Sequence, residues 1–122
     1  MTPHDFRRIA LAMAGAVESS HMNHPDFRVN GKIFATIHSD NQQGMVKLTP
    51  EQQERFMREN PGMFQPAAGA WGRGGSTMVI FAAATEAVVG EAMTLAWQSL
   101  GRQASKDSSM RRQKTKRIGR TR

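Results

Sequence analysis

The chain has 122 residues and a formal net charge of +7, and it contains no Cys and no Tyr. The absence of Cys excludes disulfides, thiolate metal sites and cysteine nucleophiles, and no apolar run reaches the roughly twenty residues of a membrane span. The charge is divided unevenly: residues 103–122 hold eight Lys or Arg and one acid, whereas residues 1–102 hold nine bases and nine acids. We therefore expect a neutral, soluble, cytoplasmic domain over residues 1–102 and a basic tail over residues 103–122.

The first element is signalled by a helix-capping pattern. Thr2-Pro3-His4-Asp5 combines an N-cap hydroxyl, a proline at the first helical position and an acid in the first turn. Apolar residues then recur with helical spacing, which predicts a helix from about Pro3 to Val17. Arg7-Arg8 before this apolar stretch, with Ala14-Gly15-Ala16 after it, also imitates a signal peptide, but the periodicity favours a helix.

Two neighbouring strands are predicted around Asn30-Gly31. This dipeptide is the strongest hairpin signal in the chain, because a type I′ turn needs positive φ at both central residues. It separates two strand-like segments, residues 27–29 and 32–37. Residues 45–48 predict a third strand.

The second half of the chain alternates helix and strand signals. Thr49-Pro50-Glu51-Gln52 repeats the capping pattern and predicts a helix from Pro50 to about Glu59. The elements expected after it are a short edge strand at 63–65, a strand at 76–81 and a helix from 85 to about 100. The predicted order is α-β-β-β-α-β-β-α, which indicates a two-layer α+β domain with an antiparallel sheet covered by helices.

A glycine-rich segment, Gly69–Gly75, surrounds Trp71 and Arg73. It is expected to run into a strand, so it lacks the helix N-terminus with which glycine-rich loops bind phosphate. One interpretation is a flexible hairpin loop with Trp71 folded over the edge of the core. The other is a mobile wing that presents Arg73 to a phosphate backbone and Trp71 to a base or a groove of the nucleic acid.

Basic residues suggest a nucleic-acid site. Arg28, Lys32 and Lys47 form a basic strip if they share the exposed face of the sheet, although a solvated polar face explains them better, because acids and bases are equal in number in the domain. The tail supplies eight more bases: Lys106, Arg111, Arg112, Lys114, Lys116, Arg117, Arg120 and Arg122. If all eight contacted DNA, the slope of log affinity against log salt would be about −7.

The tail also has a simpler interpretation. Met110 and Ile118 are its only sizeable apolar residues, so we expect it to be disordered when free. Such a segment can act as a solubilising extension, or it can bind any polyanion without base specificity. It has no amphipathic or lipidation pattern that predicts membrane anchoring.

No catalytic constellation is visible. His21 and His24 lie three residues apart in a predicted loop, and without a third ligand nearby a solvated loop explains them better than a metal site. We therefore expect no catalytic residues, no metal and no cofactor, and hence a non-enzymatic protein.

The segment Pro25-Asp-Phe-Arg-Val-Asn-Gly-Lys-Ile-Phe-Ala35 resembles the MmcQ/YjbR-like family. Ala16-Val17-Glu18, the strand at 45–48, Trp71 and Ala96-Trp97 match that family in order, so the resemblance covers about residues 3–100. It implies an α-β(3)-α-β(2)-α fold similar to type III secretion chaperones. It also implies DNA binding through two hairpin wings.

Carried over to this chain, the first wing is the Arg28–Lys32 hairpin and the second is the Gly69–Gly75 loop with Arg73. The function expected is weak, sequence-independent DNA binding by these wings and the tail. The alternative is a protein-interaction module that uses the exposed sheet face. The expected partners are therefore DNA, another polyanion or a protein, without a membrane, for a monomer or weak dimer.

Overall fold

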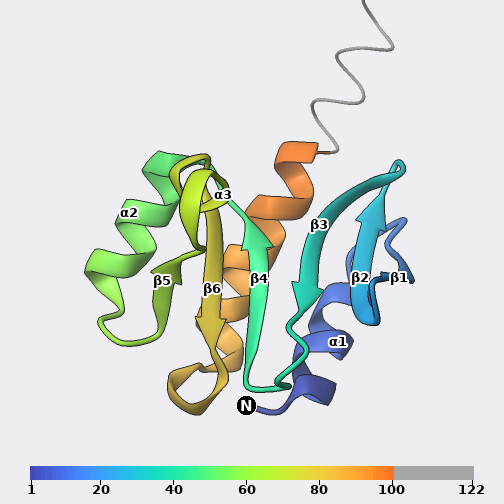
Figure 1. The fold of residues 1–122 in the computed structure, drawn as a ribbon, viewed down its shortest axis with the longest axis horizontal. Helices are drawn as coiled ribbons and strands as arrows, with labels where there is room; N and C mark the ends of the chain where they lie inside the picture. Colours follow the sequence, from blue (N-terminus) through green and yellow to red (C-terminus); the bar gives the residue numbers. More distant parts are fainter. Residues whose placement is uncertain (101–122) are drawn as a thin grey trace, which may run out of the picture.

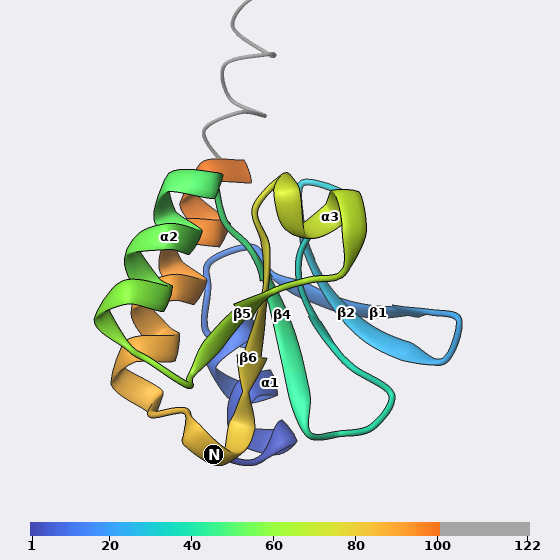
Figure 2. The ribbon, with the colours of Figure 1, turned by 60° about the vertical axis from the view of Figure 1, so that its left-hand side comes forward.

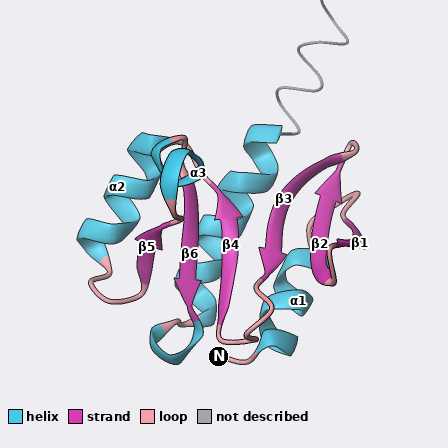
Figure 3. Cartoon of the chain, viewed as in Figure 1, coloured by secondary structure: helices cyan, strands magenta, loops and turns pink. Residues whose placement is uncertain are grey.

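Six antiparallel strands form one sheet in the computed structural model, which describes residues 1–100 (Figures 1 and 3). The strand order is β1-β2-β3-β4-β6-β5. In chain order the elements are α1 (Pro3–Leu11), β1 (Val17–His21), β2 (His24–Val29), β3 (Lys32–Ile37), β4 (Gln43–Lys47), α2 (Pro50–Glu59), β5 (Phe64–Pro66), α3 (Gly69–Arg73), β6 (Ser76–Ile80), a 3-10 turn (Phe81–Ala83) and a helix over residues 86–100. The predicted α+β class is confirmed. The predicted basic tail over 103–122 lies outside the described residues.

Three helices cover one face of the sheet and leave the other largely bare. Figures 1 and 2 show α1, α2 and the helix over 86–100 on one side, while the short α3 lies on the opposite side. The core between sheet and helices is rich in phenylalanine; its fully buried large side chains include Phe6, Phe27, Phe34 and Phe56. No helix within residues 1–100 is long and apolar enough to cross a membrane.

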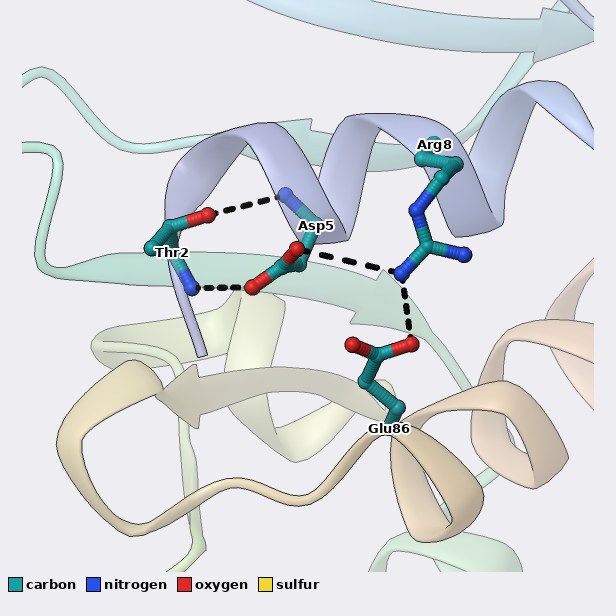
Figure 4. Close-up of polar contacts among 4 residues, drawn as sticks. All are labelled: Thr2, Asp5, Arg8 and Glu86. Atoms are coloured by element: carbon teal, nitrogen blue, oxygen red, sulfur yellow. Dashed lines mark hydrogen bonds and ion pairs between the residues drawn. The ribbon is translucent and has the colours of Figure 1, made fainter.

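Both predicted capping boxes are present, and the first also helps to place α1. The Asp5 backbone N–H donates to the Thr2 hydroxyl, and the Thr2 N–H donates to the Asp5 carboxylate, at 3.1 and 2.9 Å (Figure 4). One turn later, Arg8 forms an ion pair with Glu86 at the start of the helix over 86–100. The capping box thus provides acceptors for two backbone N–H groups that have none within the helix. The Arg8–Glu86 ion pair joins α1 to the helix over 86–100.

The prediction of a first helix reaching Val17 is wrong. The helix ends at Leu11, Gly15 follows with φ of +76°, and Val17 begins the edge strand β1 with 58% of its surface exposed. All five residues of β1 are exposed, so the strand has no apolar alternation by which sequence could reveal it. The predicted loop around His21 and His24 is instead the turn of the β1–β2 hairpin.

The predicted hairpin at Asn30-Gly31 is confirmed, with φ of +53° and +77°. Behind it, the register between β2 and β3 shifts: Arg28 pairs with Ile33, whereas Phe27 pairs with Ala35. Phe34 is therefore an additional residue, as in a β-bulge. Phe34 and Ala35 are both buried in the core, which leaves Ile33 on the bare face with Arg28.

Gly44 on β4 provides a test of how the core is packed. A Cβ atom built at this position would lie 2.7 Å from the ring of Phe6, so Gly44→Ala should destabilise the domain by about 1–3 kcal/mol. A Cβ atom built at Gly90 would have no other atom within 4 Å. Gly90→Ala, in the helix over 86–100, should therefore stabilise by up to about 1 kcal/mol. Urea unfolding of both variants checks the pair, and a neutral Gly44→Ala would contradict the packing.

Candidate nucleic-acid interface

The bare face of the sheet is hollowed into a groove of about 810 Å³, here called the sheet-face groove. Its floor is a row of side chains from neighbouring strands, because paired residues in a sheet share a face. Thr36 on β3 pairs with Met45 on β4, Met45 pairs with Met78 on β6, and Met78 pairs with Gln65 on β5. The buried residues between these positions face the helices instead.

One wall of the groove is α3, where the sequence predicted a flexible loop or a hairpin wing. That prediction is wrong, since residues 69–73 form a short helix. Glycine disfavours helix by itself, so tertiary contacts stabilise this one. The Gln53 side-chain amide on α2 lies 3.1 Å from the Gly72 and Ser76 carbonyls. A Cβ at Gly72 would lie 1.8 Å from the Ala67 carbonyl oxygen, so glycine permits this close approach.

Trp71 projects from α3 with 73% of its surface exposed. This excludes the interpretation in which it folds over the core edge. The ammonium of Lys47, at the end of β4, lies 5.9 Å from the centre of the Trp71 ring. An aromatic face and a positive charge therefore border the same groove.

Arg28 lies on the bare face but is already engaged. Its guanidinium binds the Asp26 carboxylate through two hydrogen bonds of 2.8 and 3.1 Å, and His21 Nδ1 lies 2.7 Å from the same carboxylate. Asp26 is fully buried beneath these two side chains. The hydrogen bonds from Arg28, followed by those from His21, hold the pKa of Asp26 below its ordinary value near 3.8. This ion pair gives Arg28 a structural role at the buried Asp26 carboxylate.

Sequence alone does not identify the Asp26 carboxylate as the partner of His21, because the two side chains meet only across the β1–β2 turn. His24 extends this cluster: its ring centre is 6.0 Å from that of His21 and 5.9 Å from that of His38. Across residues 1–100, no three His, Cys, Asp or Glu side chains are arranged to hold a metal ion. The groove residues Met45, Met78 and Gln65 were also missed, although alternation with buried neighbours on their strands is a usable signal.

The sequence also matches a described family. A family model named YjbR matches residues 11–99. The chain belongs to the YjbR family. The resemblance drawn from the Pro25–Ala35 segment is thereby confirmed.

The YjbR fold is shared with a solved structure, the crystal structure of Deinococcus radiodurans protein DR2400, which contains a DUF419 domain. The TM-score is 0.65 at 17% sequence identity, covering 79% of this chain and 75% of that chain. Such an identity shows the fold alone. No curated protein matches this chain.

Charge is distributed unevenly over this YjbR domain. Residues 1–100 contain eight Lys and Arg, and five of them pair with acids: Arg7, Arg8, Arg28, Arg55 and Arg58. The other three form no ion pair within that range: Lys32, Lys47 and Arg73. These three are all among the residues predicted for nucleic-acid binding.

The three unpaired bases lie at one end of the sheet. Lys47 ends β4 and pairs with Ser76, which follows Arg73 by three residues. Lys32 begins β3, and because β3 and β4 are antiparallel, the start of β3 lies at the same end as the close of β4. The helix over 86–100 also ends there (Figure 1). The predicted tail residues, Lys106 to Arg122, lie outside the described residues but follow that helix in sequence.

The buried Asp26 carboxylate should make stability depend on pH. Because its pKa is lowered on folding, the unfolded chain binds the proton first as the pH falls, and the stabilisation is lost through and below about pH 4. Asp26→Asn should cost about 1.5–3 kcal/mol at neutral pH, as for hydrogen bonds to a charged group, and it should reduce the loss of stability below about pH 4. Urea unfolding at several pH values measures both effects.

Glu59→Gln is the matched control, since Glu59 is exposed and forms no ion pair within residues 1–100. Its stability should differ from that of the unmodified chain by less than about 0.5 kcal/mol. Identical acid sensitivity in the unmodified chain and Asp26→Asn would contradict the role given to this carboxylate.

Proposed function

We propose that this YjbR-family protein is a non-enzymatic, sequence-independent DNA-binding protein that contacts phosphates at one end of its sheet. The observation that supports this most is the grouping of Lys32, Lys47 and Arg73, the bases without an acidic partner within residues 1–100. Paired bases are already neutralised, so unpaired ones contribute most to attracting a polyanion.

The position of the basic tail in the sequence also supports phosphate contacts at this end of the sheet. The helix over residues 86–100 ends at the same end of the sheet (Figure 1), and the segment over 103–122 with its eight Lys and Arg follows it in sequence. In this proposal the tail supplies most of the affinity and the domain orients the complex. Phosphate contacts of this kind give no base specificity.

Salt dependence separates the two contributions. The full chain should bind a DNA duplex with a steep slope of log affinity against log salt, and a chain ending at Arg102 should keep a slope of only roughly −3, from three phosphate contacts. Fluorescence anisotropy on a labelled duplex measures both. Equal slopes would remove the tail from the proposal, and no salt-sensitive binding by either chain would overturn it.

The domain's part is tested by charge-matched variants of the full chain. Lys32→Gln, Lys47→Gln and Arg73→Gln combined should weaken duplex binding by about tenfold or more at about 50 mM salt. The control combines Arg7→Gln, Arg8→Gln and Arg58→Gln, which remove the same charge from exposed ion pairs worth little to stability. If both triple variants weakened duplex binding equally, net charge alone would govern binding, and the role given to the three unpaired bases would be contradicted.

A second candidate function rests on the edge strand β1. All five of its residues are exposed, and within residues 1–100 it pairs only with β2. An unpaired edge can accept a strand from a partner protein. Pull-down with and without nuclease distinguishes this role, because partners that survive nuclease treatment favour a protein-interaction module.

A further inference from the structure

The sheet-face groove has features that phosphate binding alone does not require. Its volume of about 810 Å³ falls within the range of roughly 300–1,000 Å³ typical of pockets that enclose a small organic group. The apolar side chains of Met45 and Met78 form the middle of its floor. A duplex presents phosphates and groove edges to a protein and keeps the faces of its bases stacked inside. An unpaired base can place its face against such a floor.

Trp71 gives the groove a stacking surface. Its indole is 73% exposed, although large aromatic side chains usually bury most of their area. The helix that carries it is fixed, because Gln53 binds the Gly72 carbonyl and Gly72 packs against Ala67. An exposed aromatic ring on an anchored backbone is an arrangement on which single-stranded bases stack, at about 1–3 kcal/mol per base.

The charges around the groove indicate an anionic ligand. Lys47 lines it beside Trp71, whereas no Asp or Glu of the described chain does so. Gln43 and Gln65 line it with amide donors and acceptors suited to base edges, and His21 and His38 also line it. A planar group joined to a phosphate therefore matches the groove better than a cationic or purely aliphatic ligand.

We infer that the sheet-face groove takes an unpaired base of a single-stranded nucleic acid, stacked on Trp71, with an adjoining phosphate at Lys47. This inference rests on the proposed nucleic-acid function and narrows it to single strands at this site. Arg73 follows Trp71 by two residues on the same short helix. In this inference the basic tail strengthens binding of both single-stranded and duplex DNA, so the preference for single strands comes from the groove.

The test uses the full chain and three probes of equal length: a thymine strand, an abasic deoxyribose-phosphate strand and a duplex. The thymine strand should bind more tightly than the abasic strand by about five- to a hundredfold, which is the affinity equivalent of one stacked base. It should also quench tryptophan fluorescence. Trp97→Phe serves as the background, because Trp97 is the other tryptophan of the chain.

Trp71→Ala should remove the advantage of the thymine strand, while Trp71→Phe, which keeps an aromatic ring, should retain part of it. Made in the chain that keeps Trp97, both variants should lose the quenching, because Trp71 is the tryptophan that the base contacts. Duplex affinity should change little in either variant, because stacking is absent there. Circular dichroism and unfolding confirm that each variant is folded. Since the Trp71 side chain is mostly exposed, its removal should leave the core intact.

Equal affinity for the thymine and abasic strands, or a thymine affinity unaffected by Trp71→Ala, would overturn the inference. If salt-sensitive duplex binding persisted in that case, the proposed function would still stand. Absence of binding to all three probes would overturn both.

Discussion

Because successive side chains of β4 point to opposite faces of the sheet, Gly44 and Val46 pack beneath the helices while Met45 and Lys47 line the groove. The same alternation runs through β6. Stability and recognition are therefore assigned to different residues of the same strands. Phe6 can approach β4 closely only because Gly44 has no side chain, and this approach brings α1 onto the face opposite the groove.

Elements with strong local signals could be predicted from the sequence. The capping boxes at Thr2 and Thr49 and the turn at Asn30-Gly31 depend on residues close to one another in the chain. The edge strand β1 could not be predicted, since a strand exposed on both faces has no alternation. The helix α3 could not be predicted either, because Gln53, sixteen or more residues before it, supplies contacts that offset the cost of its glycines.

The candidate site was predictable in part, and for a similar reason. Composition and spacing identify Lys32, Lys47, Trp71 and Arg73 as candidates, but they do not reveal which bases already have acidic partners. Arg28 looks equivalent to Lys32 in the sequence. The Asp26 carboxylate that binds it becomes its partner only once the strand is formed and the two side chains share a face. Ion pairing thus divides bases that are indistinguishable by residue type.

The additional residue at Phe34 has a consequence for how this chain can vary. On the turn side of it, Arg28 pairs with Ile33; on the far side, Phe27 pairs with Ala35 in a different register. Such an offset can absorb a residue gained or lost in the hairpin arm, so the floor around Thr36 keeps its orientation. The arm that carries Lys32 can therefore change in length while Thr36, on the floor of the groove, stays in register with Met45 on β4.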